Sequence, residues 1–380
     1  MGDRQSGKVL LRVLLIVIVL AIAMEGSYLW LQNVYNAPGP SKDSVRIQVE
    51  QGATVRSVLL DLTKQGALRN PRAVEMYLRL ERHFKGHQPR IQVGMYEIPA
   101  RSSPAQIMDL FDQGRVVLEQ LTIIEGSRFA DLRHTLDNHA AVMHTLAGKS
   151  DAEVMTALGH AGEFPEGRFF PDTYKFAPKT TDLEILGMAY NAMQRVLDEA
   201  WQHRSENLPL QSPYEALTLA SIVEKETGLP TERPRIAGVF VSRLRKGMRL
   251  QTDPTVIYGL GANYDGYIHT RDLATDTPYN TYTRAGLPPT PIALPGRDSI
   301  MAAVHPLENG EIYFVATGLA DGAHHFSKTL DEHNAAVKSY LANLRALQHG
   351  GAGAHGPSSA THGKGMSQTG AHGAPGEGVQ

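Results

Sequence analysis

The chain has 380 residues and a formal net charge of −2, which is long enough for two domains and lacks the global basic field of nucleic-acid-binding proteins. It contains no cysteine, which excludes disulfides and thiol chemistry. It also has no glycine-rich phosphate loop and no zinc-type spacing of cysteine and histidine, so the nucleotide-binding and structural-zinc classes are excluded as well.

The amino terminus predicts a transmembrane anchor over residues 9–31. Its centre is a nearly unbroken apolar run from Val13 to Met24. With Arg12 extending toward one interface and Tyr28 and Trp30 at the other, the segment is long enough for the ~30 Å hydrocarbon core of a bilayer. We therefore expect a single-pass membrane protein.

Basic residues precede this span and few follow it. The positive-inside rule places residues 1–8 in the cytoplasm and the rest outside, which predicts an inner-membrane protein with a periplasmic catalytic region. The residues Ala21-Ile22-Ala23 resemble a cleavage site, so a removed signal peptide is the alternative, and the globular part is exported in both cases. Residues 32–44, which contain Pro38-Gly39-Pro40, predict a linker.

Residues 45–115 predict a small module in the order strand, helix, helix, strand. The alternation over 45–49 and the short run 94–98 indicate the strands. Thr54 and Pro71 mark the two helix starts, as an N-cap and a first-turn proline, and a further helix follows from Pro104. This order resembles the small glycan-binding LysM module. A spacer without glycan contact is the alternative.

The middle of the chain predicts a strand over 116–125, a helix capped by Ser127 and a helix over 143–159. Its histidines are not paired with carboxylates at ligand spacing, so no metal site is expected. The run 164–174 is rich in aromatic residues. Its Asp172 either binds backbone amides in a turn or belongs to the wall of a binding cleft.

Residues 214–227 predict a mostly buried helix that ends with two carboxylates. Apolar residues recur near helical spacing, and Gly228 and Pro230 form a helix stop. Both Glu224 and Glu226 therefore fall in the last turn. A long amphipathic helix over 183–201 is expected to pack against this one.

The end of a buried helix is an unfavourable place for an anion. The partial negative charge of the helix C-terminus and burial both raise the pKa of a carboxyl group, which suits a general acid near neutral pH. Glu224 and Glu226 lie about 200° apart around the axis, so only one can point into a given cleft. The other is expected to face solvent or a basic partner such as Lys225 or Arg233. The alternative is that both carboxylates are solvated.

Two loops after this helix, residues 249–255 and 278–289, combine amide, hydroxyl and aromatic side chains with glycine and proline. Such a mixture offers hydrogen bonds and stacking surfaces to a polyhydroxylated ligand. Asp253 precedes a short helical segment, where it either caps the helix or contacts substrate.

Four motifs in this order resemble the endolytic murein transglycosylase family (MltG, or YceG-like). They are Glu166–Tyr174, Ser221–Thr227, Arg249–Gly259 and Tyr279–Pro289, and the resemblance extends from roughly residue 45 to 344. It implies an α+β fold with a LysM-like subdomain followed by a catalytic domain over 116–347. It implies Glu226 as the catalytic acid and base, with no metal or organic cofactor, and substrate contacts from Gln251, Asp253, Tyr279, Asn280 and Tyr282.

The implied reaction is lytic cleavage of the MurNAc–GlcNAc bond inside nascent peptidoglycan strands, with formation of 1,6-anhydro-MurNAc ends and termination of glycan elongation. The implied partners are the glycan strands, the membrane and, by family analogy, a peptidoglycan synthase. A conventional muramidase that uses Glu224 or Asp253 as its second carboxylate is one alternative. A non-catalytic peptidoglycan-binding scaffold is the other.

The carboxyl end predicts a strand over 311–316 and a closing helix over 330–347. Residues 348–380 are rich in glycine, histidine and small polar residues, with almost no large apolar side chain. Because such a segment cannot bury enough surface to fold, we predict a disordered tail.

Overall fold

The computed structural model describes residues 3–86, 90–319 and 321–350 of the chain. The chain divides into two compact units. The first contains the residues up to Glu119 together with Lys175–Lys179, and the second contains Gln120–Tyr174 and the residues from Thr180 onward. From the sequence we had expected the two exported parts to meet between residues 115 and 116.

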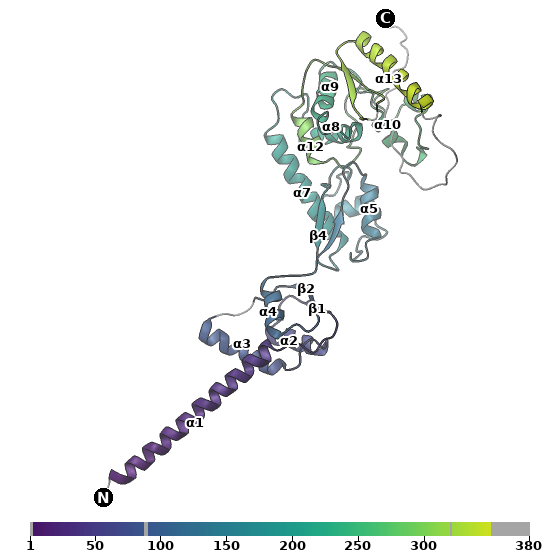
Figure 1. Cartoon of the computed structure of the whole chain (residues 1–380). Helices are drawn as coiled ribbons and strands as arrows, with labels where there is room; N and C mark the ends of the chain where they lie inside the picture. Colours follow the sequence, from purple (N-terminus) through teal and green to yellow (C-terminus); the bar gives the residue numbers. More distant parts are fainter. Residues whose placement is uncertain (1–2, 87–89, 320, 351–380) are drawn as a thin grey trace. The chain divides into compact units, whose positions relative to one another are not determined.

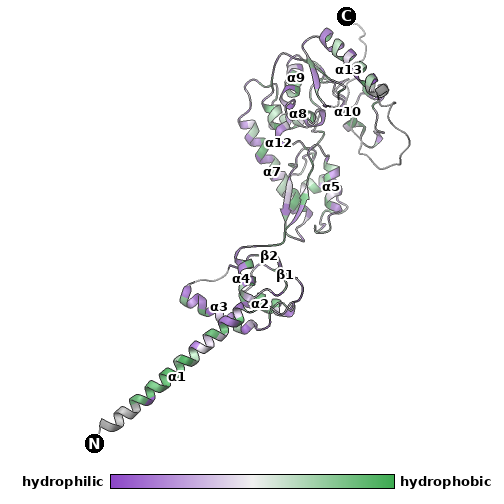
Figure 2. Cartoon of the chain, in the orientation of Figure 1, coloured by the Kyte–Doolittle hydropathy of each residue, from purple (hydrophilic) through white to green (hydrophobic). Residues whose placement is uncertain are grey.

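A single long helix, α1 (Asp3–Asn36), begins the chain (Figure 1). Its segment Leu10–Asn36 is long and apolar enough to cross a membrane, by length and composition; Figure 2 shows its largely hydrophobic colouring. The predicted linker over 32–44 is wrong in its first part, because the helix continues through Asn36. There Leu31 is buried, and Val34 and Tyr35 pack against the core of the first unit.

The first unit has the predicted order of strand, helix, helix and strand. These elements are β1 (Val45–Val49), α2 (Val55–Lys64), α3 (Pro71–Lys85) and β2 (Gly94–Ile98), followed by α4 (Pro104–Asp112). The two strands pair antiparallel with Val45 opposite Ile98. Side-chain caps from Thr54 and Ser103 begin α2 and α4, because each hydroxyl accepts a backbone N–H that the helix leaves unpaired.

The remaining elements mix helices with short strands, so the mixed α/β class is confirmed. They are β3 (Glu119–Thr122), α5 (Phe129–Asp137), α6 (Asp151–Ala157), β4 (Thr173–Phe176), α7 (Asp182–Gln202), α8 (Pro213–Glu226), α9 (Arg233–Arg245), α10 (Asp253–Leu260), the 3₁₀ turn η1 (Gly261–Asn263), α11 (Thr270–Ala274), α12 (Arg297–Val304), β5 (Tyr313–Ala316), β6 (His324–Ser327) and α13 (Leu330–Gly350). The strands form the two-stranded sheets β3–β4 and β5–β6, the latter antiparallel with Tyr313 opposite Ser327.

Helix α8 lies at the centre of the core of the second unit. Every residue from Ala216 to Val223 is buried, and α8 packs against α7, α9, α10 and α12. The predicted packing of the long helix α7 against α8 is therefore confirmed.

Four local expectations were wrong in detail, and in the first two a side chain binds a different backbone group from the one expected. The helix predicted over 143–159 is confined to α6, since the Asp182 carboxylate accepts the N–H groups of Thr145 and Leu146. Ser127 does not cap α5, because its hydroxyl donates to the carbonyl of Ile124.

The strand over 116–125 shortens to β3. Asp253 is the first residue of α10 rather than its N-cap, which is Thr252. At the carboxyl end α13 continues to Gly350, and residues 351–380 of the predicted tail lie outside the described part of the chain.

Candidate active site

The last turn of α8 carries the two carboxylates that the sequence singled out. Both are withdrawn from solvent, with Glu226 only 8% exposed and the Glu224 side chain 6% exposed. They meet different partners, as their spacing around the helix predicted. The structure therefore separates them into one ion-paired group and one group without a cationic hydrogen-bond partner.

Glu224 is the ion-paired carboxylate. Its Oε1 atom accepts a hydrogen bond of 3.2 Å from Arg233 Nη2, and its Oε2 atom accepts the N–H of Gly296 at 3.0 Å. Arg233 was one of the two basic partners expected from the sequence. These contacts join the end of α8 to the starts of α9 and α12, which is a structural role.

Glu226 accepts a hydrogen bond on Oε1 from the hydroxyl of Thr252. The pKa of Glu226 is raised to about 7, chiefly by burial and also by the nearby Asp253 carboxylate, while the Thr252 hydroxyl and the Arg243 guanidinium act in the opposite direction. A carboxyl group with this pKa is substantially protonated at neutral pH, so it can donate a proton and later accept one.

The loop that leads to Thr252 has a strained backbone at Gln251. Its φ angle of 49° lies in the left-handed region, which a non-glycine residue adopts rarely and at a cost of about 1 kcal/mol. The Gln251 side chain is exposed, whereas its N–H donates to the carbonyl of Thr281 at 3.1 Å. This backbone conformation places the accessible amide of Gln251 next to Thr252, the residue that contacts Glu226.

Asp253 follows Thr252 directly in the sequence and contacts Tyr282 of the loop 278–289; both side chains are half-buried. The Tyr282 hydroxyl donates to Asp253 Oδ1 at 2.5 Å. Burial and the Asp253 charge raise the pKa of Tyr282, so the phenol stays protonated and keeps donating. The structure therefore brings together Glu226, Asp253 and Tyr282 through the segment 251–253.

Asn280 uses its side-chain amide inside its own loop. Its Nδ2 atom donates to the carbonyls of Asp272, Leu273 and Thr275 at 2.7–3.1 Å, and its Oδ1 atom accepts the N–H of Tyr282 at 2.8 Å. The residue is 1% exposed. In this geometry it shapes the loop and orients the neighbouring tyrosine.

Tyr279 packs on Tyr258, with ring centroids 4.9 Å apart, and its hydroxyl lies 2.9 Å from Thr290 Oγ1. Tyr258 in turn donates to Glu166 Oε2 at 3.1 Å. Glu166 is 4% exposed, and burial raises its pKa to about 7. In the sequence, Glu166 stands out only as the first residue of the motif Glu166–Tyr174. Its carboxyl chemistry was missed because no helix end or charge pattern marked it.

A cavity of about 260 Å³ lies beside these loops. Thr281, whose hydroxyl accepts the N–H of Thr252 at 3.1 Å, is part of its wall. Glu226 does not line the cavity. It contacts Thr252, which in turn contacts the lining residue Thr281. The other lining residues are Pro278, Asn280, Arg284, Ala285, Gly286, Leu287, Pro288 and Pro289.

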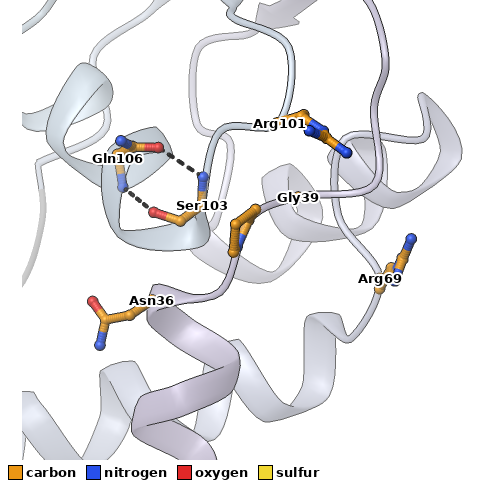
Figure 3. A pocket seen from close by; sticks show the side chains of 7 residues that line it. Asn36, Gly39, Arg69, Arg101, Ser103 and Gln106 are labelled. Carbon is orange, nitrogen blue, oxygen red and sulfur yellow. Dashed lines mark hydrogen bonds between the residues drawn. The ribbon is translucent and has the colours of Figure 1, made fainter.

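A larger cavity of about 520 Å³ lies in the first unit (Figure 3). Its side chains include Arg69, Arg101 and Gln106 but no carboxylate, so it has no group suited to general acid catalysis. Within the residues that the structure describes, no group of three histidine, aspartate or glutamate side chains is placed to hold a metal ion. The second unit therefore contains the candidate active site.

The sequence profile of the YceG-like family matches residues 47–339, which cover part of each unit and every residue of the candidate site. The chain belongs to the YceG-like family. It is 30% identical over 322 residues to an endolytic murein transglycosylase of Bacillus subtilis, covering 80% of this chain and 86% of the relative. The enzyme of the same name from Streptococcus pneumoniae is 26% identical over 368 residues, covering 85% of this chain and 64% of the relative.

A crystal structure of a YceG-like protein from Listeria monocytogenes is similar to this YceG-like chain. It is 28% identical, and the match covers 77% of this chain and 99% of that one, with a TM-score of 0.45.

Proposed function

We propose that the chain is an endolytic murein transglycosylase that cleaves the MurNAc–GlcNAc bond within peptidoglycan strands and leaves 1,6-anhydro-MurNAc ends. The observation that carries this proposal is Glu226, a buried carboxyl group at the C-terminal end of α8 with a pKa of about 7. Two relatives named endolytic murein transglycosylase support the same activity.

In the proposed reaction, protonated Glu226 first donates its proton to the glycosidic oxygen. The bond from that oxygen to the anomeric carbon of MurNAc then breaks, and the GlcNAc hydroxyl leaves. The C6 hydroxyl of the same MurNAc attacks the anomeric carbon, and the Glu226 carboxylate removes its proton. Because the attacking group is already part of the sugar, the step gains the proximity advantage and consumes no water. Acid and base chemistry of this kind needs no cofactor.

The surrounding residues have three different roles in this proposal. The exposed amide of Gln251 and the hydrogen-bonded pair of Asp253 and Tyr282 contact the glycan. Tyr279 offers its partly buried ring as a stacking surface at the rim. Asn280 acts through the loop that it holds, since its amide is already occupied.

Asp253 supports a rival chemistry, because its charge is close enough to raise the pKa of Glu226. A conventional muramidase would use such a second carboxylate to activate water or to attack carbon. Mass spectrometry of purified glycan strands digested in ¹⁸O-labelled water separates the two. Unlabelled anhydro ends support the lytic reaction, whereas reducing ends that contain ¹⁸O would show hydrolysis.

The same digestion tests the catalytic role itself. The wild type is expected to produce anhydro-ended fragments, and the Glu226→Gln variant none. A wild type that binds strands but releases no fragment would instead show a peptidoglycan-binding scaffold. Equal digestion by the wild type and the variant would show that Glu226 takes no part in the reaction.

We further propose that α1 anchors the protein in the inner membrane as a single pass, with its amino terminus in the cytoplasm and the catalytic region in the periplasm. Retention of the helix is favoured over cleavage because its last turns pack on the first unit. Residues 45–115 of the first unit then serve as a LysM-like subdomain that holds nascent strands near the membrane. A peptidoglycan synthase that extends those strands is the proposed partner, and cleavage there terminates elongation.

A further inference from the structure

Helix α1 is attached to the first unit by direct side-chain contacts as well as by the chain. The ring of Tyr35 stacks on Tyr77 of α3, with centroids 4.4 Å apart, and the ring of Tyr28 lies 6.1 Å from the same side chain. The Tyr28 hydroxyl donates to Glu81 of α3 at 3.2 Å. The position of α3 against α1 is therefore fixed within this unit (Figure 1).

These contacts define the height of α3 above the apolar run of α1. That run ends at Met24, four residues before Tyr28. The span predicted over residues 9–31 is longer than this run and has Tyr28 at its outer interface, so Tyr28 lies next to the headgroup layer of a bilayer that α1 spans. Glu81 touches Tyr28, and Lys85 Nζ lies 3.0 Å from Glu81. The last turn of α3 is consequently at headgroup height.

The composition of that last turn suits a lipid interface. Phe84 is 74% exposed, so its ring is open to a contact outside the chain. Arg82, His83 and Lys85 surround it. An exposed aromatic ring among basic side chains is typical of segments that lie in the interface of anionic membranes.

We infer that the end of α3, residues 82–85, is a second membrane contact of this protein: Phe84 inserts into the headgroup layer beside α1, and the basic side chains bind the phosphate groups of anionic lipids. This inference rests on the proposed membrane span of α1 and does not depend on glycan cleavage. Two membrane contacts would hold the first unit in one orientation on the bilayer. A unit attached by a flexible linker alone would have no fixed orientation.

The test uses single cysteines, because the natural chain has none. Phe84→Cys is the reporter, and Met76→Cys, on the same helix and 51% exposed, is the matched control. Val17→Cys, in the middle of the apolar run, reports the span of α1. Each full-length variant is labelled with a bimane fluorophore in vesicles of phosphatidylcholine and phosphatidylglycerol that contain nitroxide-labelled lipids.

We expect a headgroup nitroxide to quench the probe at position 84 several-fold more than the probe at 76, and an acyl-chain nitroxide to quench the probe at 17. Replacement of phosphatidylglycerol by phosphatidylcholine should weaken quenching at 84 and leave position 17 unchanged. Equal quenching at 84 and 76 while 17 is quenched would overturn the inference and leave the anchor intact. An unquenched probe at 17 would overturn both. Repetition in a Glu226→Gln background keeps the result independent of catalysis.

Discussion

Glu224 and Glu226 are two residues apart on one helical turn, yet the first is bound by Arg233 and the second by the hydroxyl of Thr252. The ion pair with Arg233 stabilises the negative charge of Glu224 in its buried position. Glu226 has only a neutral donor, so burial raises its pKa to about 7. One carboxylate thus stabilises the fold and the other is free to exchange a proton.

The two glutamates should respond differently to the same substitution. Glu226→Gln removes the proton donor and should lower kcat by about 10³-fold, since general acid catalysis contributes 10²- to 10⁴-fold. Glu224→Gln should destabilise folding by about 2 kcal/mol, less than the 3–5 kcal/mol of a fully broken buried pair, because Glu125 and Asp298 lie 3.9 and 3.6 Å from Arg233. Turnover assays and urea denaturation of both variants check this, and an inactive but fully stable Glu224→Gln protein would reverse the assignment.

The pH dependence of activity should follow the proton on Glu226. The acid must be protonated at the start of each cycle, so kcat/KM is expected to fall as pH rises through about 7. The pKa of Glu226 in the folded protein lies above the ordinary glutamate value of 4.5, so the folded protein binds more protons between pH 4.5 and 7 than the unfolded one. Stability from this group is fully present below pH 4.5 and is lost as pH rises toward 7.

Denaturation at several pH values measures this effect. Between pH 4.5 and 7 the free energy of unfolding should fall less steeply in Glu226→Gln than in the wild type. Glu166→Gln is the matched control, because burial also raises the pKa of Glu166 to about 7. It should flatten the stability profile and leave the alkaline fall of activity in place. Loss of that fall in Glu166→Gln would instead identify Glu166 as the titrating acid.

Thr252→Val tests the hydrogen bond to Glu226. The hydroxyl stabilises the ionised carboxylate, so its removal should shift the alkaline limb of the pH–rate profile upward by about one unit, equivalent to 1.4 kcal/mol. Thr252→Ser keeps the donor and should restore the wild-type midpoint. An unchanged midpoint in the valine variant would show that this bond does not set the pKa.

Gln251→Gly should separate stability from activity. Glycine adopts a φ of 49° without strain, so the variant should gain about 0.5–1 kcal/mol of folding stability while it loses the exposed amide. We expect a higher Tm together with a raised KM for glycan strands. Gln251→Ala keeps the strain and should raise KM without the gain in Tm; wild-type KM in both variants would exclude a substrate contact.

Asn280→Asp tests whether this residue acts through its loop. The substitution removes the donors to three backbone carbonyls and should destabilise folding by about 3 kcal/mol. Activity should fall mainly in kcat, since the loop that positions Tyr282 is no longer held by these three bonds. A rise in KM with unchanged stability would show that the amide binds the glycan directly.

Hydrophobic periodicity and helix caps account for most of the predicted fold. Thr54 and Ser103 cap the helices that the sequence placed after them, and the apolar face of α8 is buried as its spacing required. One wrong prediction has a different origin, namely contacts between residues far apart in the sequence. The helix expected from residue 143 is interrupted because Asp182, far along the chain, binds the N–H groups of Thr145 and Leu146. No local pattern announces such a partner.

The candidate site shows the same division. A helix stop after two glutamates predicted which groups would be near the end of α8, and the angular spacing predicted that they would diverge. It could not predict that Asn280 would use its whole amide inside the loop, or that Glu166 would be buried against Tyr258. Those facts depend on how distant segments pack, which hydrophobic spacing does not encode.

The final turn of α8 has one further consequence. Helix ends ordinarily fray, but here three successive side chains are fastened to other segments: Glu224 to Arg233, Lys225 to the carbonyl of Gly126 at 3.1 Å, and Glu226 to Thr252. In the proposed reaction, the carboxyl group therefore keeps the same position in every cycle. The glycan strand, rather than the proton donor, then has to move before the next cleavage.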